Sequence, residues 1–154
     1  MSIEKIIFGA GCFWGVQSVF SRMSGVTETT CGYSGGHVSH PSYEMVCSGN
    51  TGHAEVVQVE YDPEKVSTEE LLDMFWHCHD PTTKNRQGVD IGTQYRSAIY
   101  FFTEEQESAA KISRDKYQQS GRWHAPVVTE ILPVDQFYPA EDYHQHYFEK
   151  SGIR

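Results

Sequence analysis

The chain has 154 residues, of which 38% are hydrophobic and 21% charged, and its formal net charge is −9. This length and composition fit one globular domain with its own core, so we expect a single domain over residues 1–154. The acidic net charge argues against a nucleic-acid partner. The N-terminus lacks the basic region and long apolar stretch of a signal peptide, so we expect no membrane association and a cytoplasmic location.

The first part of the chain predicts a strand, a helix and two further strands. Residues 5–10, KIIFGA, form a short apolar run ended by glycine, which is typical of a buried strand. Residues 13–25 repeat apolar side chains at helical spacing and stop at Gly25. Residues 25–33 alternate weakly and residues 52–63 clearly, so both are expected to be strands.

The second part predicts helices and strands in alternation. Residues 67–78 open with a capping box, in which Ser67 is followed by Glu70, and continue with a helical stripe. The later segments are expected to be a strand, a helix, a last strand and an irregular tail with one short helix: residues 94–102, 103–121, 126–134 and 137–154. This order suits a two-layer α+β sandwich with helices on one face of a mixed sheet.

Two long polar loops, residues 33–53 and 79–93, lie between these elements. Long ordered loops tend to carry function. Tyr43 lies in the first loop and Tyr95 just after the second. Either tyrosine could donate a hydrogen bond into a site or be a core residue with a solvated hydroxyl.

Cys12 lies at the junction of the first strand and the first helix, between Gly11 and the aromatic pair Phe13 and Trp14. The free N–H groups and the dipole of a helix start stabilise a thiolate, so this position predicts a lowered thiol pKa and a nucleophile. The flanking glycines, Gly11 and Gly15, would let a partner approach closely. The alternative is a buried structural cysteine.

Phe13, Trp14 and Glu55 each leave two interpretations open. The aromatic pair either places one ring in the core and the other on the surface, or walls an apolar pocket beside the thiol. Glu55, at the start of an apolar strand, is either exposed or partly desolvated, and desolvation would raise its pKa and make it a proton donor near neutrality.

The remaining cysteines and histidines give no strong metal or redox motif. Cys31, Cys47 and Cys78 show no C-x-x-C spacing with each other or with Cys12, and we expect thiols in a reducing compartment. The histidines in HCHD at 77–80 and HQH at 144–146 invite a metal site, but no established ligand spacing supports one, and we expect none.

Five segments occur in a fixed order over most of residues 6–103: GCFWG (11–15), GYSGG (32–36), SYEMVCSGNTGHAEVVQVEYDP (42–63), HDPT (79–82) and RQGVDIGTQYRSAIY (86–100). Together they resemble the A-type peptide methionine sulfoxide reductases. The resemblance implies a ferredoxin-like α+β sandwich. It also implies reduction of the S epimer of methionine sulfoxide, free or in proteins, without a metal or organic cofactor.

The resemblance also implies roles for individual residues. Cys12 matches the nucleophile, whose thiolate attacks the sulfoxide sulfur and becomes a sulfenic acid. Glu55 matches the acid that protonates the sulfoxide oxygen. Tyr43 and Tyr95 match two tyrosines that hold this oxygen. Asp90 matches a residue that binds the substrate backbone and shapes the site. Phe13 and Trp14 match the aromatic wall for the S-methyl group.

The chain differs from many family members in its tail, which ends in YFEKSGIR and carries no resolving cysteine. Cys31, Cys47 and Cys78 are the internal candidates, Cys47 standing where the family often has a structural cysteine. We expect instead that an external thiol, such as thioredoxin, glutaredoxin or a small thiol, reduces the Cys12 sulfenic acid. The alternative is a non-catalytic module that senses oxidants or binds oxidised methionine.

Overall fold

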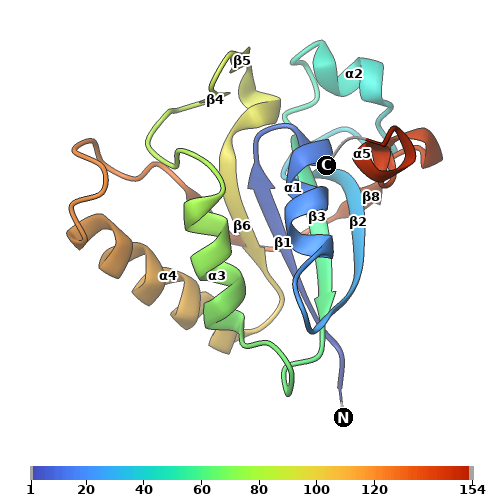
Figure 1. The fold of residues 1–154 in the computed structure, drawn as a ribbon. Helices are drawn as coiled ribbons and strands as arrows, with labels where there is room; N and C mark the ends of the chain where they lie inside the picture. Colours follow the sequence, from blue (N-terminus) through green and yellow to red (C-terminus); the bar gives the residue numbers. More distant parts are fainter. Residues whose placement is uncertain (1, 153–154) are drawn as a thin grey trace.

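A six-stranded sheet with helices packed on one face forms the frame of the protein (Figure 1). The computed structural model describes residues 2–152. Its elements in chain order are β1 (Glu4–Ala10), α1 (Phe13–Ser21), β2 (Val26–Ser34), α2 (Tyr43–Cys47), β3 (Ala54–Tyr61), α3 (Thr68–His77), β4 (Arg86–Gln87), β5 (Asp90–Ile91), η1 (Thr93–Tyr95), β6 (Ser97–Phe101), α4 (Glu104–Gln119), β7 (Glu130–Pro133), β8 (Phe137–Pro139), η2 (Asp142–His144) and α5 (Tyr147–Lys150).

The strands lie in the order β7-β6-β1-β3-β2-β8. Every neighbouring pair is antiparallel except β6 and β7, which are parallel, so the sheet is mixed as expected. β1 therefore lies inside the sheet and ends at Ala10, directly before the start of α1. Cys12 is thus carried on the end of a strand that is paired on both sides.

The alternation of β1 divides the core between the two faces of the sheet. Ile6 and Phe8 face the helices, and the Phe8 ring stacks on Phe20 of α1 at 4.8 Å and on Phe75 of α3 at 5.0 Å. Ile7 points to the other face, where a smaller cluster is covered by the segment after β7 through Val134 and Phe137. The predicted placement of helices on one face is confirmed.

The helix starts show why α1 differs from the other long helices. The predicted capping box of α3 is present, because Ser67 and Glu70 each accept a hydrogen bond from the other's backbone N–H. Thr103 caps α4 through its side chain. At α1 the N-cap is Cys12, which makes no side-chain cap, so the first N–H groups of this helix are left for other acceptors.

Several boundaries differ from the sequence-based expectations. α1 ends at Ser21 rather than at Gly25. The strand expected over 126–134 is limited to β7, because its partner β6 begins at Ser97 and the first pair between the two strands is Ala98 with Glu130. The expected short helix of the tail is present as α5, whereas α2, the β4–β5 hairpin and the edge strand β8 were not predicted. Within residues 2–152, no helix has the length and apolarity that a bilayer span requires.

Candidate active site

Cys12 lies at the N-cap of α1 as a half-buried free thiol. Gly11 turns the chain from β1 into α1 with a φ of +98°, a left-handed conformation that favours glycine. A side chain at this position would come within 2.9 Å of Cγ of Gln87. The close approach expected at Gly11 is therefore made by the chain itself, which brings the β4–β5 hairpin next to the thiol.

The expectation of a lowered Cys12 pKa is wrong for the free protein. Burial raises the pKa of the Cys12 thiol to about 11. The nearby backbone N–H groups of Trp14 and Gly15 lower it, as the helix start predicts, but the nearby carboxylates of Glu55 and Asp90 raise it further. Desolvation thus outweighs the helix N-terminus, and the resting group at neutral pH is the thiol.

Glu55 lies in β3 and only 1% of its surface is exposed. Its Oε1 accepts a hydrogen bond of 3.2 Å from the backbone N–H of Phe13, the residue after Cys12, and its buried Oε2 has no partner within residues 2–152. Burial raises the pKa of Glu55 to about 7, against the lowering effect of the Phe13 bond. The desolvated interpretation of Glu55 therefore describes the structure, and this carboxyl exchanges a proton near neutral pH.

Phe13 and Trp14 take different environments. The Phe13 ring is fully buried in the core and lies 5.7 Å from the ring of Tyr33 and 6.3 Å from that of Tyr43. Trp14 is partly exposed and stacks on Tyr147 of the tail at 3.9 Å. One ring thus points inward, and the other lies under the C-terminal segment.

The two tyrosines and Asp90 reach the site from separate elements. Tyr43 begins α2, Tyr95 ends η1 and Asp90 begins β5. Burial raises the pKa of Tyr95 to about 12, and the nearby negative charges of Glu55 and Asp90 raise it further. Asp90 also raises the pKa of both Cys12 and Glu55, so these predicted residues share one electrostatic environment.

Residues of the tail complete the site, and the sequence analysis assigned them no role there. The carboxylate of Glu141 accepts hydrogen bonds from the Tyr33 hydroxyl at 2.9 Å and from the backbone N–H of Tyr43 at 3.0 Å. His144 is buried between the rings of Phe13, Trp14 and Tyr43. The HQH pattern at 144–146 was the available signal, and it was considered only as a metal pattern.

Gln145 fixes this tail to the body of the protein. Its side-chain oxygen accepts from the backbone N–H of Cys31 at 2.9 Å, and its amide nitrogen donates to the carbonyl of Cys31 at 3.0 Å and to that of Ala140 at 3.1 Å. Gln17 of α1 donates to the same oxygen and accepts from the backbone N–H of His146. The tail is therefore held against both α1 and β2.

The other cysteines are free thiols. Cys31 is fully buried, and its Sγ donates to Oε1 of Gln17 at 3.1 Å. Burial raises the pKa of Cys78 to about 12 and also raises that of Cys31 and of the exposed Cys47. His79 bonds to the carbonyl of Phe75 and to Ser97, so its ring has a structural role.

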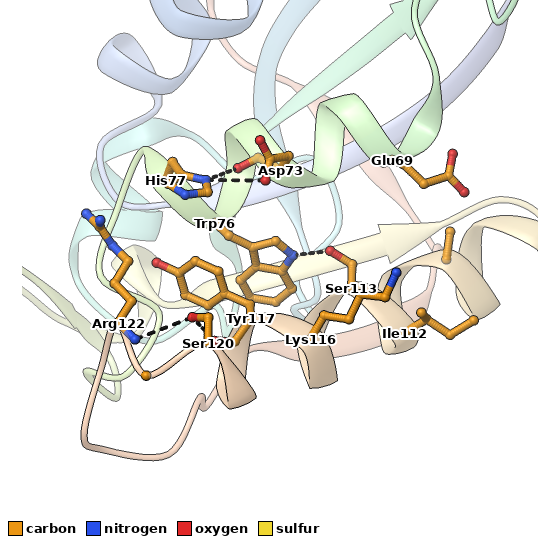
Figure 2. Close-up of a pocket in the computed structure, with 12 residues that line it drawn as sticks. Glu69, Asp73, Trp76, His77, Ile112, Ser113, Lys116, Tyr117, Ser120 and Arg122 are labelled. Carbon is orange, nitrogen blue, oxygen red and sulfur yellow. Dashed lines mark hydrogen bonds and ion pairs between the residues drawn. The ribbon is translucent and has the colours of Figure 1, made fainter.

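A groove of about 840 Å³ between α3 and α4 lies apart from these residues (Figure 2). Trp76 and Tyr117 stack at 5.5 Å there, and the indole N–H donates to Ser113. None of the predicted site residues lines this groove. The chemistry is therefore concentrated at the start of α1.

A half-buried cysteine whose neighbouring acid exchanges a proton at neutral pH is the arrangement of a cysteine-dependent oxidoreductase or transferase. The model of the family "Peptide methionine sulfoxide reductase" matches residues 4–153. The peptide methionine sulfoxide reductase MsrA of Geobacter metallireducens is 59% identical over 150 residues, covering 97% of this chain and 93% of that protein. The chain belongs to the peptide methionine sulfoxide reductase family.

Solved structures agree with this assignment. Mxr1 from Saccharomyces cerevisiae in reduced form has a TM-score of 0.92 at 35% identity, covering 97% of this chain and 86% of that one. The structure of Mxr1 in complex with Trx2 has a TM-score of 0.67 at 24% identity, covering 94% and 84%. The second similarity shows the shared fold.

Proposed function

We propose that this protein reduces methionine S-sulfoxide, free or in proteins, to methionine at the expense of a thiol. The observation that carries this proposal is the link between Glu55 and Cys12. The acid binds the N–H of Phe13, next to the thiol, and its pKa of about 7 lets it hold or release a proton at neutral pH. Such a pairing suits a reaction that needs a nucleophile and a proton donor together.

The resting pair already holds the single proton that the first step consumes. Transfer of the Cys12 thiol proton to an ionised Glu55 gives a thiolate and a neutral carboxyl group. The thiolate attacks the sulfoxide sulfur, and Glu55 protonates the departing oxygen. A bond forms between the two sulfur atoms as the sulfur–oxygen bond of the substrate breaks. The hydroxyl group made from the sulfoxide oxygen then bonds to the Cys12 sulfur, the sulfur–sulfur bond breaks with its electron pair remaining on methionine, and Cys12 is left as the sulfenic acid. The balanced step uses no metal and no organic cofactor.

The other residues hold the substrate during this step. Tyr43 and Tyr95 donate hydrogen bonds to the sulfoxide oxygen, and burial supports this role because it keeps both hydroxyls protonated by raising their pKa. Asp90 binds the backbone of the substrate. Phe13 and Trp14 form the apolar wall for the S-methyl group, since one ring is buried and the other lies beside it.

An assay on separated sulfoxide epimers tests this function. We expect wild-type protein with dithiothreitol to reduce the S epimer, and Cys12→Ser to lose turnover while it keeps the fold by circular dichroism. A matched Cys78→Ser variant, changed at the thiol that ends α3, should retain activity. Turnover by Cys12→Ser, or no turnover by the wild type with any thiol, would contradict the proposal.

An external thiol is the reductant that we propose for the sulfenic acid. Three features support it: Cys31 is buried with its Sγ bound to Gln17, Cys78 is half-buried, and burial raises the pKa of all three other thiols. Yeast Mxr1 has been captured with Trx2, and a thioredoxin is accordingly our first choice, ahead of glutaredoxin or a small thiol. A reaction that consumes thiols requires a reducing compartment, and we propose the cytoplasm.

The strand order supports a more specific description of the fold. Strands β1, β2, β3 and β6, with α1 and α3 as connections, lie in the order β6-β1-β3-β2, and each neighbouring pair is antiparallel. We propose that this is a ferredoxin-like unit, extended by β7 and β8 at its two edges. We also propose that residues 1–154 act as one domain, because the tail contributes to a site built on β1 and α1.

A further inference from the structure

The side-chain amide of Gln87 in β4 binds the turn that precedes the β4–β5 hairpin at two points. Its Oε1 accepts a hydrogen bond of 2.9 Å from the backbone N–H of Asp80, and its Nε2 donates one of 2.8 Å to the carbonyl of the same residue. An amide that pairs with both backbone groups of one residue is fixed in position and in orientation. Gln87 therefore links the hairpin firmly to Asp80.

The backbone of Asp80 is itself held in place. Oδ1 of Asp80 accepts hydrogen bonds from the backbone N–H of Thr82 at 2.9 Å and from the Thr82 hydroxyl at 2.6 Å, which closes the turn. The preceding residue, His79, is buried and bonds to the carbonyl of Phe75 in α3 and to the hydroxyl of Ser97 in β6. The turn at Asp80 is thus tied to both α3 and the main sheet.

The aliphatic part of Gln87 lies against the turn that carries Cys12. A Cβ atom added at Gly11 would come within 2.9 Å of Cγ and 3.0 Å of Cβ of Gln87, so these methylene groups and the Gly11 backbone are in contact. Gly11 immediately precedes Cys12, the proposed nucleophile. The side chain of Gln87 therefore spans the distance between the turn at Asp80 and the start of α1.

Gln87 and Asp90 are direct partners in the β4–β5 ladder. Side chains of directly opposed residues in an antiparallel pair point to the same face. The other pair is Arg86 with Ile91, which points to the opposite face, and both of these side chains are exposed. Gln87 and Asp90 are both half-buried. The face that Gln87 holds against Gly11 is therefore the face that carries the Asp90 carboxylate.

The hairpin is too short to hold this position without an external contact. Each of its strands has two residues, and an isolated two-stranded hairpin is marginally stable in water. Its other side-chain bonds are local, because Arg86 donates to the carbonyl of Gly88 and Thr83 donates to that of Arg86. Figure 1 shows the hairpin at the end of the molecule where α1 begins. The position of Asp90 thus depends on Gln87.

We propose that Gln87 is a positioning residue of the reductase reaction, which holds Asp90 at the site of Cys12. It does so by fixing the hairpin to Asp80 through its amide and to Gly11 through its methylene groups. This inference rests on the proposed function, in which Asp90 binds the backbone of the substrate. Gln87 acts through Asp90 rather than on the reacting atoms, so its loss weakens substrate binding more than the transfer of oxygen.

Gln87→Met separates the two contacts of this side chain. Methionine keeps an unbranched chain that packs on Gly11, but its thioether does not donate and accepts only weakly, so both bonds to Asp80 are lost. The matched control is Gln119→Met, the same substitution at an exposed position of α4. Steady-state kinetics use the S-sulfoxide of N-acetylmethionine amide as substrate and dithiothreitol as reductant.

We expect Gln87→Met to raise KM roughly tenfold, the scale set by the loss of two hydrogen bonds, and to change kcat by less than about threefold. Gln87→Asn keeps the amide on a shorter chain that cannot reach both Asp80 and Gly11, and it should show the same loss. Gln119→Met should match the wild type. An unchanged KM in both Gln87 variants, or a loss confined to kcat, would overturn the inference.

A double-mutant cycle with Asp90→Ala tests whether Gln87 acts through Asp90. Asp90→Ala alone should raise KM. In that background, Gln87→Met should change kcat/KM by less than about twofold, because the side chain that it positions is already absent. A purely structural role would instead give independent losses that multiply, and that result would contradict the inference.

The reactivity of the Cys12 thiol gives a second measurement, which needs no turnover. The ionisable groups that share its environment are Glu55 of β3, Asp90 of β5, Tyr95 of η1 and Cys31 of β2, and the hairpin loop adds the exposed cations Lys84 and Arg86. Release of the hairpin admits water to the thiol and moves the Asp90 carboxylate away. Both changes lower the Cys12 pKa from about 11.

We therefore expect iodoacetamide to alkylate Cys12 several-fold faster in Gln87→Met than in the wild type at about pH 8, as measured by peptide mass mapping. Gln119→Met should leave the rate unchanged. Equal rates in Gln87→Met and wild type would show that Gln87 does not hold the hairpin, and would overturn the inference while leaving the reductase function intact. Absence of turnover by the wild type would instead be a failure of the proposed function, whatever the alkylation rates.

Discussion

The indole N–H of Trp14 donates a hydrogen bond of 2.9 Å to Nδ1 of His144, across 130 residues of sequence. Because Nδ1 is the acceptor, a neutral His144 carries its proton on Nε2, which is buried without a partner within residues 2–152. Burial lowers the pKa of His144, which favours this neutral form. The tail thus sets the orientation of an aromatic ring beside Cys12, the proposed nucleophile.

Substitution of His144 should remove the hydrogen bond that fixes the Trp14 side chain. His144→Leu leaves the indole N–H without an acceptor, so we expect a loss of about 1–3 kcal/mol in the free energy of unfolding and a higher KM for the S-sulfoxide. His144→Asn keeps an acceptor near the position of Nδ1 and should recover most of both properties. Urea titration and steady-state kinetics measure the two effects. His144→Gln places its amide near the position of Nε2 instead. If it recovered activity better than His144→Asn, the hydrogen bond with Trp14 would not explain the effect of His144 on KM.

Glu55 should destabilise the protein as the pH rises. Its native pKa is about 7, above the usual value of 4.5, so the folded state keeps the proton longer than the unfolded chain. The stabilising contribution is complete below pH 4.5 and is lost as the pH rises through 7. Glu55→Gln removes this titration and should gain up to about 3 kcal/mol in stability relative to wild type between pH 4.5 and pH 8.

Urea unfolding at several pH values measures this difference, with the exposed Glu28→Gln as a control that should show no such trend. A difference between Glu55→Gln and wild type that stays constant with pH would mean that Glu55 is not desolvated. The same variant should reduce sulfoxide more slowly, and the gain in stability would then accompany a loss of function at one residue.

Gly11→Ala should disturb the hairpin that carries Asp90. Alanine is strained at a φ of +98°, and its methyl group would lie 2.9 Å from Cγ of Gln87. We expect a loss of more than about 1 kcal/mol in unfolding free energy and a lower kcat/KM. Gly121→Ala, at a φ of +79° with no atom within 4 Å, isolates the backbone strain alone. Equal effects of the two variants on kcat/KM would show that the contact with Gln87 does not matter.

Much of the frame could be predicted because the local signals agree with it. The capping box at Ser67, the alternation of β3 and the apolar run of β1 are all found, and the motifs around Cys12 and Glu55 place both residues in one site. The short elements α2, β4, β5 and β8 could not be predicted, since they have two to five residues each and are stabilised by long-range pairing rather than by periodicity.

The contribution of the tail and the direction of the Cys12 pKa depend on packing that sequence spacing does not contain. The side chain of Gln145 binds the backbone N–H and carbonyl of Cys31, as a neighbouring strand would, although 114 residues separate the two residues. The helix start at Cys12 was predicted, and its N–H groups do lower the thiol pKa. Burial by the neighbouring hairpin and strands nevertheless makes the net shift of this pKa upward. The balance of these opposing effects is set only in the folded protein.

The position of the tail also bears on how the enzyme matures during synthesis. The ribosome makes Trp14 130 residues before His144, and Cys31 114 residues before Gln145. Until then the strands that carry the thiol can pair, but the Trp14 indole lacks its acceptor and the backbone of Cys31 lacks the Gln145 side chain that binds it. A nascent chain is thus spared a finished, oxidisable active site until His144 and Gln145 have been synthesised.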